Sequence, residues 1–290
     1  MASSRATLQQ PFERMRGYPS AHRMFQRKLG YALDLKAPRS FNHRLAWKKL
    51  YDRNPSLTIT ADKFAVRDYV QDRLGHEAAR RILVPLLYAT TDPESIPFET
   101  LPSDYVIKAN HSSGRNVIVR DGVVNRAAVV SDCKRWLRAP FDAVKGEWAY
   151  ADIPRKIVVE SLLLDETGDI PADYKLFMFG GACAVIQVDV DRFTNHTRSL
   201  YDPDWNRLSV TYKYPDGRGA SRPACLAAML EIAEKLSAGF DFVRVDLYVV
   251  RDRIYFGEMT HYPECGLGRF DPQSYDFELG RRWPVAGGDR

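Results

Sequence analysis

Residues 243–262 read VRVDLYVVRDRIYFGEMTHY and contain two apolar runs separated by the polar triplet at 251–253. In both runs, branched and aromatic side chains alternate with other residues, as in strands that bury one face. A short polar break between two such runs is typical of a β-hairpin. The stretch therefore predicts two antiparallel strands with one face in the core and one face that carries charge.

The register of this hairpin decides which side chains meet. A three-residue turn at 251–253 pairs residue 250 with residue 254 and sets every pair that follows. Asp246 then lies opposite Glu258, and Arg244 lies opposite Thr260. The same register places Tyr248 opposite Phe256 on the charged face and gives the apolar face to Val243, Val245, Leu247, Val249, Tyr255 and Met259.

The two opposed carboxylates predict a cation between them. Directly opposed side chains have Cβ atoms about 5 Å apart, so Asp246 and Glu258 repel unless a positive charge intervenes. Two carboxylates and the hydroxyl of Thr260 suit a hard ion that binds oxygen, such as Mg²⁺. The alternative is an ion-pair cluster of Arg244 with the two carboxylates on a solvated sheet face.

The composition describes a globular protein of one large domain or two modest ones. The 290 residues are 45% hydrophobic, and 42 Lys and Arg against 37 Asp and Glu leave a net charge of +5. Because no long basic run occurs, we expect no nucleic-acid partner and favour anionic small molecules. No segment has the roughly 18 apolar residues of a membrane span or the apolar middle of a secretory signal, so we expect a cytoplasmic protein without a transmembrane segment.

Two segments place lysines where they can meet an anion. Residues 62–75, DKFAVRDYVQDRLG, predict a helix with Asp62 as N-cap and Gly75 as stop. On it, Lys63 and Arg67 form either a surface cationic pair or a cationic edge that faces a phosphate. Strands are expected at 105–109 and 116–119, and Lys108 precedes the loop 110–115 between them.

The loop at 110–115 is not a P-loop, because it leads into a strand rather than a helix. It can still fold over a polyphosphate with its backbone N–H groups and the hydroxyls of Ser112 and Ser113. Lys108 either reaches the same anion or extends to solvent.

Further elements follow along the chain. Short helices are expected in residues 1–56, and longer ones at 131–148 and 223–238. A buried strand at 156–160 ends in Glu160, and two strands about Gly180–Gly181 place Asp173, Lys175 and Phe177 on one face. The polar segment 191–205 is either a functional loop or a solvated connection. The four Cys are widely spaced and form no CxxC, so they predict reduced thiols.

The order of these parts resembles the ATP-grasp superfamily: a lysine on a helix, a lysine before a flexible loop, a strand that ends in Glu, and Asp and Glu on a final hairpin. More closely, the chain resembles the TupA-like ATP-grasp family, which is associated with bacterial cell-surface polysaccharide gene sets. The similarity covers residues 41–280 through ADKFAVRDYV, YVIKANHSSG, VVESLL, DYKLFMFGG, DRFTNHTRSLYDPDW, FVRVDLY and YFGEMTHYPECGLGRFDP.

The resemblance implies an α+β protein with the ATP-grasp fold, in which two subdomains with antiparallel sheets grip ATP. A short helical region at 1–56 would precede an N-terminal lobe at 57–160, which holds the phosphate lysines and the flexible loop. A C-terminal lobe at 161–290 would hold the ribose and metal sites. The chain lacks an obvious βαβ domain of the kind that often precedes an ATP-grasp unit.

The resemblance also implies roles for individual residues. The expected nucleotide contacts are Lys63, Lys108, His111, Ser112, Ser113, Gly114, Glu160, Ser161, Leu162, Leu163 and Asp173. The expected metal ligands are Asp246, Glu258 and Thr260, although most ATP-grasp enzymes have Asn at the third position. Arg244, Arg192 and Lys175 are the expected catalytic residues, with the arginines neutralising the γ-phosphate or an acyl phosphate.

The implied activity is that of an ATP-dependent carboxylate-amine ligase that uses one or two Mg²⁺ ions and an acyl-phosphate intermediate. Its partners would be a small-molecule or polysaccharide carboxylate and an amine, in the synthesis of a bacterial cell-surface polysaccharide or a peptide conjugate. The alternatives are a phosphotransferase, a glycosyltransferase that uses nucleotide sugars, and a nucleotide-binding regulator without catalysis. The presence of Lys108, Asp246 and Glu258 disfavours the regulator.

Overall fold

The computed structural model describes residues 16–139, 146–191 and 195–283. Its helices are α2 (Pro19–Leu29), α3 (Phe41–Tyr51), α4 (Ser56–Ala61), α5 (Val66–Leu74), α6 (His76–Ile82), α7 (Arg126–Arg138), α8 (Leu226–Ser237) and α9 (Ser274–Arg282), with 3-10 turns η1 (Pro93–Ser95), η2 (Trp148–Tyr150) and η3 (Pro263–Gly266). None of the helices in these ranges is long and apolar enough to span a membrane.

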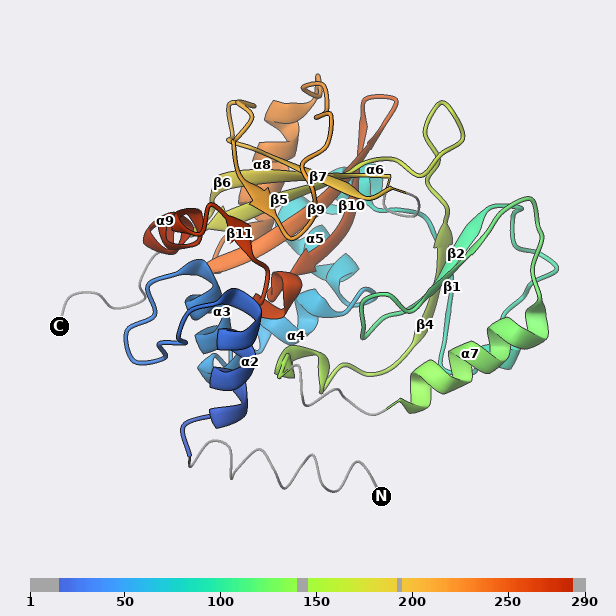
Figure 1. The fold of residues 1–290 in the computed structure, drawn as a ribbon. Helices are drawn as coiled ribbons and strands as arrows, with labels where there is room; N and C mark the ends of the chain where they lie inside the picture. The colour runs from blue at the N-terminus through green and yellow to red at the C-terminus, as the bar shows by residue number, and fades with distance from the viewer. Residues whose placement is uncertain (1–15, 140–145, 192–194, 284–290) are drawn as a thin grey trace.

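The strands form two larger antiparallel sheets and one small one (Figure 1). The four-stranded sheet has the order β1 (Leu86–Thr90), β4 (Ile157–Ser161), β2 (Tyr105–Ala109), β3 (Asn116–Val119). The five-stranded sheet has the order β10 (Arg253–Thr260), β9 (Phe242–Val250), β5 (Asp173–Phe179), β6 (Ala182–Val190), β7 (Thr197–Tyr201), and β11 (Phe270–Asp271) pairs with β8 (Thr211–Tyr212). The predicted α+β class, with a helical N-terminal region, is confirmed.

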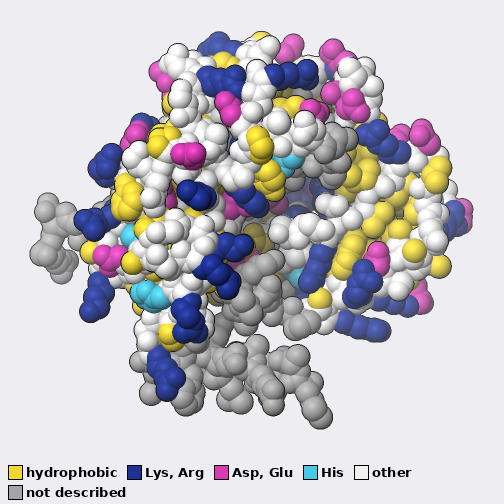
Figure 2. Space-filling view, viewed as in Figure 1, with side chains coloured by type: hydrophobic (Ala, Val, Ile, Leu, Met, Phe, Trp, Pro, Cys, Tyr) yellow, Lys and Arg dark blue, Asp and Glu magenta, His cyan; other side chains and the backbone are white. Residues whose placement is uncertain are grey.

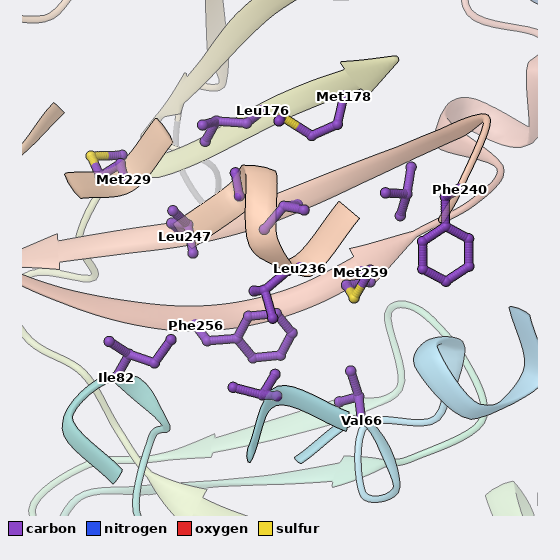
Figure 3. Close-up of a cluster of buried hydrophobic side chains, with 14 of the residues drawn as sticks. Val66, Ile82, Leu176, Met178, Met229, Leu236, Phe240, Leu247, Phe256 and Met259 are labelled. Atoms are coloured by element: carbon purple, nitrogen blue, oxygen red, sulfur yellow. The ribbon is translucent and has the colours of Figure 1, made fainter. Parts of the chain in front are cut away.

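One face of the five-stranded sheet is mainly apolar. Alternate residues of β9, such as Val245 and Leu247, point into a core that also contains Leu176 of β5. Helices α4, α5, α6 and α8 contribute to the same core, and Figure 3 shows Leu236 of α8 and Val66 of α5 beside the sheet residues. This core is the largest buried cluster among the described residues.

The opposite face of the same sheet is divided in two. At one end, Phe177, Phe179 and Phe242 pack under Phe41 of α3 and Trp283, which directly follows α9. Helix α3 therefore lies against this half of the sheet, next to α9 (Figure 1). The other half carries charged side chains, so the N-terminal helical region seals the apolar half and leaves the charged half for other contacts.

The four-stranded sheet packs one face against α7. Ile107 and Ile157 in the sheet share a core with Val129 and Trp136 of the helix. Asn125 caps α7, since its side chain accepts a hydrogen bond from the Ala128 N–H at 3.1 Å. The helix predicted at 131–148 therefore begins earlier and ends at Arg138, while residues 140–145 lie outside the described ranges.

The hairpin of β9 and β10 pairs Asp246 with Glu258 as predicted, but for a different reason. The turn has two residues, Arg251 and Asp252, both with positive φ as in a type I′ turn, and not three. This turn shifts the register by one position, and a bulge at Gly257 shifts it back.

The predicted pairing of Tyr248 with Phe256 is wrong because it lies between the turn and the bulge. Tyr248 pairs with Tyr255, and Phe256 pairs with Leu247. Phe256 is buried in the apolar core with Met259, as Figure 3 shows, whereas Tyr255 is not part of that core. Phe256 thus lies on the apolar face and Tyr255 on the other face, the reverse of what was expected.

Two further expectations need correction. Helix α5 begins at Val66 and not at 62, although Asp62 still accepts the Phe64 N–H at 2.8 Å and Gly75 ends the helix with φ 82°. The polar segment 191–205 contains an edge strand, β7, which pairs with β6. A strand with the sequence TRSLY has too little apolar alternation to be recognised.

Gly257 is required at the bulge because nothing larger fits. A Cβ at this position would lie 2.9 Å from Tyr248 Cε2 and 3.0 Å from the carbonyl oxygen of Asp246. We expect Gly257→Ala to lower the free energy of unfolding by about 1–3 kcal/mol, measured by urea denaturation. Val123→Ala, at an exposed position, is the control and should change it by less than about 0.5 kcal/mol. Equal stability of the two variants would contradict the proposed crowding.

Candidate active site

The charged half of the five-stranded sheet is centred on Arg244 and Asp246 of β9. The Arg244 guanidinium donates through Nε to Asp246 Oδ1 at 2.7 Å and through a terminal nitrogen to Oδ2 at 2.6 Å. Both side chains are buried, with 7% and 3% of their surfaces exposed. Burial lowers the pKa of Arg244, but Asp246 outweighs this effect and raises the pKa above its ordinary value. The pair is therefore a buried, two-point ion pair.

Glu258 lies next to this pair on β10 and forms an ion pair with a lysine from outside the sheet. Lys63 Nζ is 2.8 Å from Glu258 Oε2, and an Arg244 nitrogen is 3.7 Å from Oε1. The Thr260 hydroxyl donates to Glu258 Oε1 at 3.2 Å. Burial acts to raise the pKa of Glu258, but Lys63 and Arg244 outweigh it and hold the pKa well below its ordinary value. Glu258 is thus ionised at neutral pH.

The two opposed carboxylates differ in their electrostatic surroundings. Burial raises the pKa of Asp246 despite Arg244 and Lys175, and the charge of Glu258 acts in the same direction. At Asp246 burial outweighs the cations, whereas at Glu258 the charges of Lys63 and Arg244 outweigh burial.

Lys175 of β5 extends the charged cluster from β9 to the neighbouring strands. Its Nζ is 2.6 Å from Asp173 Oδ2, 3.5 Å from Asp189 Oδ2 and 3.7 Å from Asp246 Oδ2. The side chain of Lys175 is almost fully buried. Asp173 and Lys175 are thus part of a buried network that joins β5, β6 and β9.

Arg198 belongs to the same charged cluster and lies on β7, the edge strand at the opposite side of the sheet from β10. It donates to Asp189 through Nε at 2.6 Å and to Glu264 Oε1 at 3.0 Å. Burial acts to raise the pKa of Asp189, but Arg198 and Lys175 hold it well below its ordinary value. Sequence reasoning missed Asp189, Arg198 and Glu264. Two signals were available: the polar pair Gln187 and Asp189 in the otherwise apolar run AVIQVDV, and the polar segment 191–205, which contains Arg198.

A second charged cluster belongs to the four-stranded sheet. Glu160 of β4 accepts Lys108 Nζ at 2.9 Å through one oxygen and an Arg67 terminal nitrogen at 3.2 Å through the other. Lys108 and Glu160 share one sheet face with Val106 and Val158, two buried valines. Lys63 and Arg67 are therefore not a solvated surface pair, since each faces a carboxylate of a different sheet.

Charged side chains of both signs line the hollow between the two sheets in the space-filling view (Figure 2). The part of the chain before α5 supplies Lys63 to the five-stranded sheet, and α5 supplies Arg67 to the four-stranded one. The structure thus brings together the predicted residues Lys63, Glu258, Thr260, Arg244, Asp246, Lys175 and Asp173 in one cluster, and Lys108 with Glu160 in the other.

The loop after β2 is only partly exposed. His111 is buried, with Nδ1 3.1 Å from Asn110 Oδ1 and Nε2 3.2 Å from the Trp136 carbonyl oxygen. Burial and the nearby Arg155 lower the pKa of His111 to about 4, so the ring is neutral at pH 7. The Ser112 hydroxyl is buried without a hydrogen-bond partner among the described residues. Ser113 and Gly114 are exposed, so the loop tip is the part that solvent reaches.

The resemblance to ATP-grasp proteins places the adenine hinge at Glu160, Ser161, Leu162 and Leu163. Ser161 ends β4 and donates its N–H to the Pro85 carbonyl oxygen at 3.0 Å, while the Leu162 N–H donates to the Asp104 carbonyl oxygen at 3.3 Å. Leu163 is half-buried, as are its two predecessors. Arg192, the remaining predicted catalytic residue, lies outside the described residues.

The oxygen donors in the charged cluster of the five-stranded sheet suit a hard divalent ion. Among the described residues, no group of three His, Cys, Asp or Glu side chains forms a metal cage of its own. Mg²⁺ usually takes only one or two carboxylates from a protein and completes its shell with water and substrate phosphate. Asp246 and Glu258, with the Thr260 hydroxyl, match that smaller requirement.

Comparison with known proteins identifies one family. A family model described as TupA-like ATPgrasp matches residues 43–283, which confirms the resemblance. A comparison with curated protein sequences finds no significant match.

Similar solved structures include the D-alanine–D-alanine ligases of Bacillus anthracis, bound to ATP, and of Helicobacter pylori. Their identities are 17% and 10%, their TM-scores 0.40 and 0.43, and the alignments cover 71% and 86% of this chain. N5-carboxyaminoimidazole ribonucleotide synthetase from Thermus thermophilus is 14% identical with a TM-score of 0.44 over 82% of this chain. The chain spans 55%, 69% and 56% of these three proteins, respectively. The family assignment rests on the sequence match.

The depressed pKa of Glu258 predicts how stability depends on pH. A carboxylate with a lowered folded-state pKa stabilises the fold above its unfolded pKa, about 4.3, and loses this contribution as the pH falls through the folded value. Because the Glu258 side chain is 34% exposed, the pair with Lys63 contributes about 1 kcal/mol. We expect Lys63→Met to lower the free energy of unfolding by this amount at pH 7, and by less only as the pH falls toward the lowered folded-state pKa of Glu258.

The control for this measurement is Lys134→Met, whose partner Glu94 is mostly exposed. It should change the free energy of unfolding by only a few tenths of a kcal/mol at any pH. Urea denaturation across the pH range measures both variants. A loss in Lys63→Met at pH 7 that is no larger than the loss in Lys134→Met would contradict the assignment.

Proposed function

Because the chain belongs to the TupA-like ATP-grasp family, we propose that it is an ATP-dependent ligase that joins a carboxylate to an amine. The observation that carries the proposal is the convergence of cations from two sheets beside two opposed carboxylates. Lys63, Arg244, Asp246 and Glu258 meet on one sheet, and Lys108 projects from the other. Cations and carboxylates in this arrangement suit phosphoryl transfer, which depends on electrostatic positioning.

In this proposal ATP lies between the two sheets. Lys63 and Lys108 hold its phosphates, beneath the loop formed by His111, Ser112, Ser113 and Gly114. The face with Val106 and Val158 provides an apolar surface beside Lys108 that suits a planar base. The hinge at Glu160, Ser161, Leu162 and Leu163 meets the adenine edge, and Asp173 meets the ribose.

The metal site of the proposal consists of Asp246, Glu258 and Thr260. Bound Mg²⁺ would neutralise charge on the phosphates during transfer. Thr260 offers one neutral oxygen and already bonds to Glu258, so its hydroxyl either coordinates the ion or orients the neighbouring carboxylate.

The proposed reaction has two steps. The substrate carboxylate takes the γ-phosphoryl group of ATP to give an acyl phosphate and ADP, and an amine then displaces phosphate to form an amide. Arg244, Lys175 and Arg192 stabilise the charge on the transferred group. No protein nucleophile is needed, which agrees with a cluster that consists mainly of Lys, Arg and carboxylates.

The substrate class follows from the family rather than from the site. We propose that the enzyme attaches an amino acid or another amine to a carboxylate in the synthesis of a bacterial cell-surface polysaccharide or a peptide conjugate, and that it acts in the cytoplasm. The net charge of +5 agrees with an anionic substrate. The three-part division at residues 56 and 160 remains a prediction.

Glu258→Gln tests the metal assignment. This variant keeps the shape of the side chain and removes a ligand charge, whereas Asp246→Asn would leave the buried Arg244 without its charged partner. We expect the Mg²⁺-dependent release of ADP to fall by about 100-fold or more. Glu94→Gln, at an exposed position, is the matched control and should retain the activity. Near-normal turnover in Glu258→Gln would overturn the assignment.

Trapping of the intermediate tests the class of reaction. An acyl phosphate reacts with hydroxylamine, so enzyme, Mg-ATP, hydroxylamine and a panel of amino acids and uronic acids should yield a hydroxamate together with ADP. Lys108→Ala should lose the product, because Lys108 holds a phosphate in the proposal. A stable phosphorylated product without a hydroxamate would identify a phosphotransferase instead. Release of UDP from a nucleotide sugar would identify a glycosyltransferase.

A further inference from the structure

Asn110 lies at the junction of the two sheets, directly after β2 and two residues beyond Lys108. It is fully buried, with 0% of its surface exposed. Ala109 on its N-terminal side belongs to the core of the four-stranded sheet. Across the junction, Ala61 and Val66 belong to the core of the five-stranded sheet. The Asn110 side chain thus provides polar contacts at a point where neither core extends.

Every hydrogen-bonding group of the Asn110 amide has a partner. Nδ2 donates to Asp62 Oδ1 at 2.8 Å and to the Pro154 carbonyl oxygen at 2.9 Å. Oδ1 accepts the Lys156 N–H at 2.8 Å and also lies 3.1 Å from His111 Nδ1. Since both Nδ2 partners are acceptors, the orientation of the amide is chemically fixed.

The backbone of Asn110 extends the same connections. Its carbonyl oxygen accepts the Lys63 N–H at 3.1 Å, and its N–H donates to the Lys156 carbonyl oxygen at 3.1 Å. One residue therefore joins three segments: the turn before α5 that carries Lys63, the chain just before β4, and the loop that follows Lys108. These bonds connect the segments that carry the two proposed phosphate lysines, Lys63 and Lys108.

Only Asn satisfies this position. Asp would bring a second carboxylate against Asp62 and offer no N–H donors. Ala or Ser would leave several buried polar groups without partners, and each such group destabilises the fold. Gln would need room for one more methylene group in a closed junction.

We propose that Asn110 is a positioning residue for nucleotide binding, which sets Lys63 and the 110–115 loop relative to Lys108 so that both lysines reach the phosphates of one ATP. The proposal rests on the proposed function, because it assumes that Lys63 and Lys108 bind phosphate. It goes further in assigning their relative placement to a residue that need not contact the nucleotide. A displacement of about 1 Å is enough to weaken such a two-point contact strongly.

The test compares Asn110→Ala with Asn42→Ala, a matched control. Asn42 is also 0% exposed, and its Nδ2 donates to the Gly268 carbonyl oxygen and to Asp276 Oδ2, both at 2.8 Å. Both variants should lower the melting temperature. Only Asn110→Ala should raise the Kd of Mg-ATP, by about tenfold or more, while the Kd of adenosine stays within about twofold. A purely structural role would weaken both ligands or neither.

Two further measurements complete the test. In a double-mutant cycle with Lys63→Ala, the losses in ATP affinity should be less than additive, because Asn110 acts through Lys63. Asn110→Ser keeps one hydrogen-bonding group and provides the same comparison if Asn110→Ala does not fold. Unchanged ATP affinity in the Asn110 variants would overturn this inference alone. Failure of the unsubstituted chain to bind Mg-ATP would overturn the proposed function and the inference together.

Discussion

The buried ion pair of Arg244 and Asp246 constrains the rest of the site. Each charge loses its hydration in the sheet, at a cost of several kcal/mol, and only close pairing offsets that cost. The two residues are two positions apart on β9, so they share one face and the bond between them is local. Residues on the neighbouring strands must then carry the opposite charge to the member of the pair that they face. Lys175 of β5 faces Asp246, and Glu258 of β10 faces Arg244. The network is a consequence of burying the first pair.

The same constraint explains why one sheet face has two halves. Burying apolar side chains stabilises the fold, whereas covering charged side chains with a hydrophobic helix costs free energy, so β5 changes character along its length. Phe177 and Phe179 lie under α3 and α9, while Asp173 and Lys175 belong to the charged half. The N-terminal helices carry no chemical motif of their own, yet they define where the site ends by covering the remainder of the sheet.

Local sequence patterns predicted the elements of this structure better than its long-range contacts. The strands around Lys108 match the predicted limits, because alternation and turn residues are local signals. The pairing of Asp246 with Glu258 was correct through two compensating features, a two-residue turn and a bulge at Gly257, and the residues between them were assigned to the wrong faces. Bonds between distant segments, such as Arg67 to Glu160 or Arg198 to Glu264, leave no periodic trace in a single sequence.

The charges of the site already form ion pairs with one another, so a nucleotide that binds there has to replace some of these pairs. The cations around each carboxylate determine the free-energy cost of that replacement. Glu160 has both Lys108 and Arg67, and Glu258 has both Lys63 and, at 3.7 Å, Arg244. If Lys108 and Lys63 turn to the phosphates, as proposed, each carboxylate keeps a second cation and is not left buried and unpaired. The cost of breaking one ion pair is thereby limited to its own Coulomb energy, without the larger penalty of an isolated charge. If the lysines bind ATP as proposed, Arg67 and Arg244 therefore stabilise the same carboxylates before and after the exchange, and this keeps the exchange reversible.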